Sequence, residues 1–403
     1  MTADVNYRKT IYACFVGYIV QAIVNNFVPL LFVTFQGSYG IPLSKITMLI
    51  TLNFVIQLLV DLLSAAFVDR IGYRASILIA HACAAVGLVG LAFLPDLLTD
   101  PFAGLLISVV VYAVGGGLLE VLVSPIIEAC PTDNKEKVMS LLHSFYCWGH
   151  VGVVLISTLF FALFGIENWK ILALVWALFP IVNGILFAGA PIRSLKEEGE
   201  SGMSLRDLAS SKVFWIMMLM MLSAGASEQA VSQWASTFAE AGLGVTKAVG
   251  DLAGPMAFAF LMGTSRLIYG KFGHRLNLNR FMAGSCLLCI FCYLWIAWIP
   301  VPFLGLVGCA VCGFSVGILW PGTFSKASAA IRGGGTMMFA LLALAGDLGC
   351  TSGPTFAGLV SSRFGNDLHT GILAAVIFPV LLLAGMVLCR KVKPGAAGES
   401  GRM

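Results

Sequence analysis

The hexapeptide Asp69-Arg70-Ile71-Gly72-Tyr73-Arg74 separates two long apolar stretches, which cover about residues 45–68 and 75–95. Each stretch has about the 20 residues that a helix needs to cross ~30 Å of hydrocarbon. Further apolar stretches of similar length lie on both sides, at about residues 10–35, 101–128, 138–164, 169–190, 212–239, 249–270, 281–300, 303–325, 336–361 and 371–389. The sequence therefore predicts an all-α polytopic membrane protein with 12 transmembrane helices.

The basic residues predict how these helices are oriented. Nineteen of the 24 lysines and arginines lie in every second gap between apolar stretches, beginning with Arg8 and Lys9. The others are Lys45, Lys170, Lys247 and Arg363, in the remaining gaps, and Arg266, inside a span. Because basic side chains stay on the cytoplasmic side of a bilayer, we expect both termini to be cytoplasmic.

Composition excludes several classes of protein. Hydrophobic residues make up 59% of the chain and charged residues 11%, whereas soluble domains have roughly 25% charged residues. The net charge of +4 follows from the topology, so no nucleic-acid partner is expected. Nearly all of the 11 cysteines lie inside apolar stretches, where thiols pack as small apolar groups. No metal or cofactor is expected, since zinc sites normally draw ligands from turns and separate elements.

The longest hydrophilic interruption divides the chain into two halves of six predicted helices each. The predicted parts are an N-terminal half at 1–190, a cytoplasmic linker at 191–211, a C-terminal half at 212–393 and a disordered tail at 394–403. The two halves share a few short, weakly similar segments. The hexapeptide returns as Gly270-Lys271-Phe272-Gly273-His274-Arg275, without the acid, and Pro125 is matched by Pro321.

The hexapeptide resembles the cytoplasmic signature of the major facilitator superfamily, which lies between helices 2 and 3. The resemblance implies two equivalent halves around a midplane site that opens alternately to each side. It also implies that the hexapeptide helps to hold the halves together on the inner side. The residues that the resemblance assigns to this cytoplasmic gate are Asp69, Arg70, Gly72 and Arg74.

Charged residues inside the spans need an explanation, because a charge at mid-bilayer costs ~2.5–3.5 kcal/mol even on the mildest scale. The acids are Asp61, Glu120, Glu228 and Asp347, and Arg266 is the only deep base. Structural pairing is one explanation for each of them. Glu120 and Glu228 also lie among other features of a binding site, and a lone glutamate there can gain and lose a proton as water reaches it.

The surroundings of Glu120 resemble the fucose-permease branch of the superfamily. Members carry Gly-x-x-x-Glu-x-x-x-Asn-Pro in helix 4, and this chain has Glu120 and Pro125 with Ser124 in place of the asparagine. The resemblance implies that Glu120 carries a proton. We further hypothesise that His143, in the fifth span, pairs with Glu120.

Candidate substrate contacts lie in the first, fifth and seventh spans. The asparagine-rich first span and the aromatic–glycine segment of the fifth resemble the same branch, which implies roles for Asn25, Asn26 and Tyr146. In the seventh span, a carboxylate, two carboxamides and an indole within two turns are typical of sugar binding; these residues are Glu228, Gln229, Gln233 and Trp234. Trp234 could instead anchor the helix at the interface. Asn53 and Gln57 either line the same site or join helices.

We therefore expect a monomeric transporter of the bacterial inner membrane that imports a sugar or sugar derivative by proton symport. A proton-coupled exporter of drugs or metabolites, a uniporter and a sodium-coupled carrier stay open, as do a membrane sensor and a polytopic transferase. An enzyme is not expected. The segment Gly313-Phe314-Ser315-Val316-Gly317 spells a hydrolase elbow, but that elbow requires a strand–turn–helix context and this one lies within an apolar helix.

Overall fold

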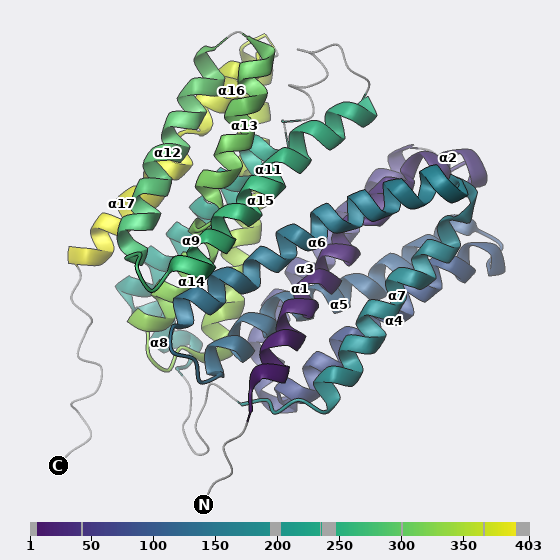
Figure 1. Ribbon diagram of the computed structural model, residues 1–403, viewed down its shortest axis with the longest axis horizontal. Helices are drawn as coiled ribbons and strands as arrows, with labels where there is room; N and C mark the ends of the chain where they lie inside the picture. Colours follow the sequence, from purple (N-terminus) through teal and green to yellow (C-terminus); the bar gives the residue numbers. More distant parts are fainter. Residues whose placement is uncertain are drawn as a thin grey trace, which may run out of the picture. The chain divides into compact units, whose positions relative to one another are not determined.

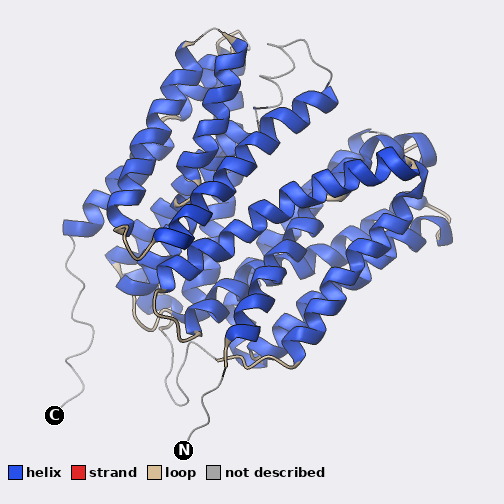
Figure 2. Ribbon diagram, in the orientation of Figure 1, coloured by secondary structure: helices blue, strands red, loops and turns tan. Residues whose placement is uncertain are grey.

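The computed structural model describes residues 6–41, 43–193, 203–233, 235, 247–299, 301–365 and 367–391. Every regular element in these ranges is a helix (Figure 2). The predicted all-α class is therefore confirmed.

Most of these helices are long and apolar. Within the described residues, 10 helical segments are long and apolar enough to cross a membrane. The other two predicted spans, at 45–68 and 249–270, coincide with helices α3 (Leu43–Ile71) and α11 (Lys247–Phe272). The chain is a polytopic membrane protein, whereas the count of 12 and the side of the termini stay predictions.

By its internal packing, the chain divides into two compact units. The first unit combines Met1–Asp133 with Leu142–Glu197, and the second combines Asn134–Leu141 with Glu198–Met403. The boundaries of the predicted halves, linker and tail stay predictions. The structure adds one feature that the sequence did not suggest, since the short segment 134–141 belongs with the second unit.

The first unit runs from purple to teal in Figure 1. Besides α3, its elements are α1 (Arg8–Asn26), η1 (Val28–Leu31), α2 (Phe32–Tyr39), α4 (Tyr73–Leu97), α5 (Pro101–Ala129), most of α6 (Lys135–Phe164), η2 (Ile166–Asn168) and α7 (Trp169–Ala188). Helix α4 packs against α5 and α7, and α5 also packs against α1 and α3.

Local sequence explains where several of these helices begin and end. Helix α1 ends at Asn26 and gives way to a 3-10 turn containing Pro29, which lacks the N–H that a continuing helix requires. Between α3 and α4, Gly72 has φ +86°, a conformation that only glycine adopts without strain. Helix α5 begins with Pro101 after Asp100, whose carboxylate accepts from the Phe102 N–H.

The glycine triplet of α5 explains why three helices can approach it closely. A Cβ at Gly115 would lie 2.6 Å from the Ala80 carbonyl oxygen of α4. A Cβ at Gly116 would lie 3.0 Å from Val24 of α1, and one at Gly117 would lie 3.1 Å from the Gln57 Cα of α3. Small residues thus bring three backbones against α5, as is common between helices in membranes.

Besides α11, the elements of the second unit are α8 (Leu205–Ser210), α9 (Lys212–Ser232), α12 (Leu278–Trp298), α13 (Pro302–Val316), α14 (Leu319–Ala330), α15 (Gly335–Arg363), α16 (Leu368–Ala375) and α17 (Ile377–Lys391). Helix α9 packs against α15 and α17, while α13 packs against α11 and α12. The start of α6 joins this unit because the Ser140 hydroxyl donates to the Arg266 carbonyl at 2.8 Å and the Tyr269 hydroxyl donates to Glu136 at 2.8 Å.

One span of the second unit is interrupted at Gly317–Ile318, between α13 and α14. In a continuous helix the Gly317 carbonyl would accept from the N–H of residue 321. Residue 321 is Pro321, which has no N–H, so that carbonyl is left for another donor.

Candidate functional site

Three polar side chains of α1 form the centre of the candidate site in the first unit. Tyr18, Gln21 and Asn25 are three and four residues apart, so they lie on one helical face. Each of them contacts a polar side chain from another helix. We call these three residues the α1 polar row.

Gln21 binds the predicted proton carrier. Its Nε2 donates to Oε2 of Glu120 on α5 at 2.7 Å. Gln21 is buried with 2% of its surface exposed, whereas Glu120 is half-buried. The carboxylate thus has a neutral carboxamide as a partner inside the unit.

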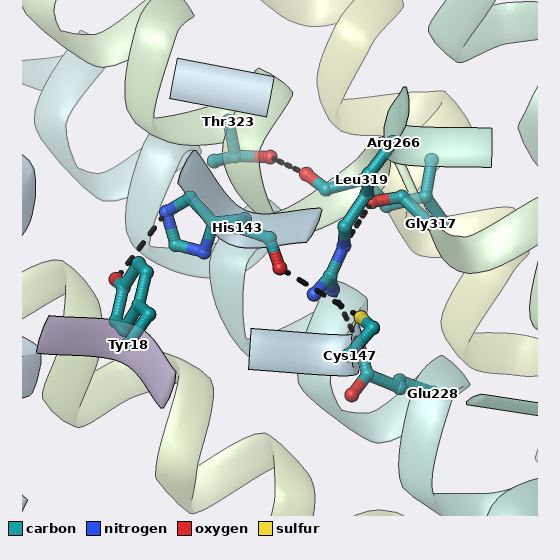
Figure 3. Close-up of polar contacts among 8 residues, drawn as sticks. All are labelled: Tyr18, His143, Cys147, Glu228, Arg266, Gly317, Leu319 and Thr323. Carbon is teal, nitrogen blue, oxygen red and sulfur yellow. Dashed lines mark hydrogen bonds and ion pairs between the residues drawn. The ribbon is translucent and has the colours of Figure 1, made fainter. Parts of the chain in front are cut away.

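Tyr18 belongs to a buried triangle with Ser124 and His143. Its hydroxyl lies 3.1 Å from Oγ of Ser124 and 3.5 Å from Nε2 of His143, and Ser124 Oγ lies 3.4 Å from the same nitrogen. Figure 3 shows the Tyr18 hydroxyl directed at the His143 ring. Ser124 is one turn from Glu120 on α5. The α1 polar row therefore contacts His143 through Tyr18 and Glu120 through Gln21. Direct pairing of His143 with Glu120 stays a prediction.

Asn25 accepts hydrogen bonds from two polar side chains of α3. Its Oδ1 accepts from Gln57 Nε2 at 2.7 Å and from Asn53 Nδ2 at 3.3 Å. A Cβ at Gly116 would lie 3.5 Å from Gln57 Oε1, so Gln57 packs over the glycine one turn before Glu120. Asn53 and Gln57 therefore join helices at the candidate site.

Two oxygen atoms in this region are buried without a hydrogen-bond partner among the described residues. They are Oε1 of Gln21 and Oδ1 of Asn53, on side chains that are 2% and 5% exposed. An unpaired buried acceptor costs about 1–3 kcal/mol. Such atoms are rare in native proteins, so each one calls for an explanation.

In the second unit, Glu228 of α9 forms an ion pair with Arg266 of α11. Nη2 of Arg266 lies 3.2 Å from Oε2 of Glu228, and 5% and 13% of the two side chains are exposed. Nε of Arg266 donates to the Gly317 carbonyl at 2.8 Å (Figure 3). Arg266 therefore supplies the donor that Pro321 cannot.

The other sequence-predicted substrate residues have varied surroundings. Gln233 donates to Oε1 of Gln229 at 3.0 Å, and Gln233 is exposed just beyond the end of α9. The Asn26 amide donates to Ala22 of its own helix at 2.9 Å. The Tyr146 ring lies 6.4 Å from that of Tyr18, in an edge-on arrangement. Trp234 lies outside the described residues.

The predicted gate residues make contacts within the first unit. The Arg74 guanidinium donates to the carbonyls of Phe187, Ala188 and Ala190 at 3.0, 2.7 and 2.7 Å. Arg74 therefore caps the C-terminal end of α7, and the predicted role of the hexapeptide in holding the halves together stays a prediction. Arg70 is exposed, and the side chain of Asp69 lies outside the described part of the chain.

Sequence reasoning missed Tyr18 and Gln21 as members of the site. The available signal was their spacing, since Tyr18, Gln21 and Asn25 repeat at helical intervals in an otherwise apolar segment. A buried polar group inside a span usually faces another polar group, but spacing alone does not say which one.

Comparisons with known structures support the fold. A variant of the Escherichia coli fucose:proton symporter matches with a TM-score of 0.79 and 14% identity, covering 95% of this chain and 99% of that one. A proton:xylose symporter matches with a TM-score of 0.77 and 12% identity, covering 95% of each chain. The human organic anion transporter MFSD10 matches with a TM-score of 0.73 and 15% identity, covering 94% and 99%.

Sequence comparison shows the family directly. A comparison with curated proteins gave no match. The family model of the Major Facilitator Superfamily matches residues 13–354, which is most of the chain. The chain therefore belongs to the major facilitator superfamily, and it is a transporter and not an enzyme.

Proposed function

We propose that this transporter imports a small polar solute, a sugar or sugar derivative, together with protons across the bacterial inner membrane. The observation that carries the proposal is the half-buried Glu120 carboxylate, which is bound by the neutral Gln21 amide within the α1 polar row. The fold that the chain shares with a fucose:proton and a proton:xylose symporter supports it.

Glu120 is the proposed proton carrier, and His143 the proposed second proton-coupling residue. A carboxyl group that is bound by a neutral carboxamide, as Glu120 is by Gln21, can exist in both protonation states, which a proton carrier requires. The hydroxyl groups of Tyr18 and Ser124 adjoin the His143 ring, and a hydroxyl group can both donate and accept a hydrogen bond. These groups can pass a proton without becoming charged themselves.

Amides and phenols suit a substrate with many hydroxyl groups, because they donate and accept hydrogen bonds. In the first unit, the proposed contacts are Asn25, Asn26 and Tyr146. In the second unit they are Glu228, Gln229, Gln233 and Trp234, of which Glu228 also neutralises Arg266. We further propose that both termini are cytoplasmic, that the hexapeptide at 69–74 acts at the cytoplasmic side, and that the carrier works as a monomer.

The experiment is uptake by proteoliposomes that contain the purified full chain, with a panel of sugars and sugar derivatives added singly. An external pH electrode records proton movement. At a membrane potential of ~100 mV, each proton supplies ~2.3 kcal/mol, enough for about 50-fold accumulation of an uncharged solute. We expect one solute class to drive proton uptake, and Glu120→Gln to abolish it.

The matched control is Glu167→Gln, which neutralises an exposed acid of the same unit and should leave uptake unchanged. Uptake without proton movement would contradict the proposal and favour a uniporter or a sodium-coupled carrier. Proton release from the vesicles on solute addition would instead identify an exporter.

A further inference from the structure

Two glutamates inside the spans have partners that differ in charge, since one partner is a cation and the other is neutral. Glu228 has Arg266 at 3.2 Å, and Glu120 has Gln21 at 2.7 Å. A guanidinium only donates hydrogen bonds and keeps its charge, so it favours the ionised form of a carboxyl group. A carboxamide has a donor end and an acceptor end, so it suits both forms of a carboxyl group.

The Gln21 amide has its donor end on Glu120 and its acceptor end unused. Oε1 is buried and has no hydrogen-bond partner among the described residues. If the amide turns by half a rotation, Oε1 faces Glu120 and can accept from a protonated carboxyl. In each orientation, one end of the amide is bonded to Glu120 and the other end lies in the buried position that Oε1 occupies in this structure.

We propose that Gln21 is the positioning residue that allows Glu120 to take up and release its proton, by presenting its N–H to the carboxylate and its carbonyl to the carboxylic acid. This inference rests on the proposed function, in which Glu120 carries the proton. The proton comes from water on one side and adds to a Glu120 oxygen. It returns to water on the other side, and only the hydrogen bond between Gln21 and Glu120 is exchanged.

Other titratable groups lie on the helices around this part of α5. Tyr18 of α1 and His143 of α6 contact Ser124, and Asp61 of α3 lies fully buried one turn beyond Gln57. On α4, His81 accepts from Asn183 at 2.8 Å and contacts the Ile77 carbonyl at 2.7 Å. Because each could contribute to a pH profile, the test includes Asp61→Asn, His81→Gln and His143→Gln as separate variants.

The test compares two transport modes in proteoliposomes. Solute counterflow exchanges labelled for unlabelled solute and needs no net proton movement, whereas accumulation driven by a pH gradient does. Gln21→Met removes both ends of the amide at similar volume, and Gln21→Lys keeps only a donor. We expect each to lower proton-driven accumulation by at least about tenfold, or about 1.4 kcal/mol, while counterflow persists. Gln21→His, which can donate and accept, should restore part of the coupling.

Gln57→Met is the matched control. Gln57 is an equally buried glutamine, 3% exposed, but its amide binds the neutral Asn25. We expect this variant to raise the KM for the solute and to leave the pH profile of accumulation at its wild-type position. Equal changes of the pH profile in Gln21→Met and Gln57→Met would overturn the inference, because a general packing effect would explain both.

The outcomes separate the inference from the proposed function. If Glu120→Gln abolishes proton movement but all Gln21 variants keep wild-type coupling, the inference is wrong and the proposed function stands. If the wild-type protein moves no protons with any solute, the proposed function fails and the inference fails with it. Loss of coupling in both Gln21→Met and Gln21→Lys, with counterflow kept, supports the inference.

Discussion

Arg266 donates from Nε to the backbone carbonyl of Gly317 at 2.8 Å, across 51 residues of sequence. The same guanidinium binds Glu228, so one buried cation stabilises both an acid and an interrupted span. Pro321 creates the need for this contact, because it removes the N–H that would otherwise serve Gly317.

Removing that cation should destabilise the second unit strongly. Arg266→Met leaves the Glu228 carboxylate and the Gly317 carbonyl without this donor, and breaking a buried ion pair by removing one partner costs about 3–5 kcal/mol. Thermal unfolding in detergent measures the change. The double variant with Glu228→Gln should lose less than the sum of the single changes, whereas Arg363→Met, at an exposed position, should change little. Additive losses would contradict the pairing.

The glycine triplet gives a prediction about packing. Gly115→Ala would place a methyl group 2.6 Å from the Ala80 carbonyl, so α4 and α5 must separate. We expect a loss of about 1–3 kcal/mol, as for other overpacked sites. Gly152→Ala, in α6, has no heavy atom within 4 Å of the new Cβ, and it should stabilise the chain by about 0.4–1 kcal/mol. Equal unfolding temperatures for the two variants would be inconsistent with close approach at Gly115.

The cap of α7 predicts a difference between the two arginines of the hexapeptide. Arg74→Ala removes three hydrogen bonds to carbonyls at the end of α7 and should cost about 0.3–1 kcal/mol, the usual contribution of a cation at a helix C-terminus. Arg70→Ala, at an exposed neighbouring position, should cost less in the same thermal unfolding measurement. A larger loss for Arg70 would mean that the stabilising role lies there.

Asp367 predicts a pH dependence at the start of α16. Its carboxylate accepts from the Thr370 hydroxyl and from the N–H groups of His369 and Thr370, which hold the pKa of Asp367 below its usual value. Because the pKa is lowered by folding, this stabilisation is present above the unfolded pKa and is lost as the pH falls through the folded value. Asp367→Ala should cost about 0.5–2 kcal/mol near neutral pH.

Asp367→Asn keeps a capping oxygen without the titration, so it serves as the control. Its unfolding temperature should fall less than that of the wild type between neutral pH and about pH 3, below the usual aspartate pKa of about 3.9. Parallel pH profiles for the two proteins would contradict an important contribution from this cap.

Much of the fold could be predicted from sequence because membrane spans have a fixed length and composition. The apolar stretches coincide with helices, and Gly72 lies in the turn that the hexapeptide suggested. The interruption at Gly317 was harder to predict, since its cause, Pro321, lies four residues later and its consequence depends on a donor from α11.

The candidate site was less accessible to sequence reasoning. Glu120 and Glu228 attracted attention because acids are rare in spans, but nothing local distinguishes their partners. Gln21 lies 99 residues from Glu120 and Arg266 lies 38 residues from Glu228, so only tertiary packing shows that one acid has a neutral partner and the other a cation. The pattern of charges along the chain could not predict this difference.

The discontinuous second unit has a consequence for biosynthesis. Ser140 leaves the ribosome with the first half of the chain, yet its partner Arg266 follows 126 residues later. At a synthesis rate of about 5–20 residues per second, the start of α6 is made roughly 6–25 s before the part of α11 that it contacts. During that interval Glu136 and Ser140 lack the partners that Tyr269 and Arg266 later provide, so a nascent chain stalled between these points would present this segment to chaperones and insertion factors.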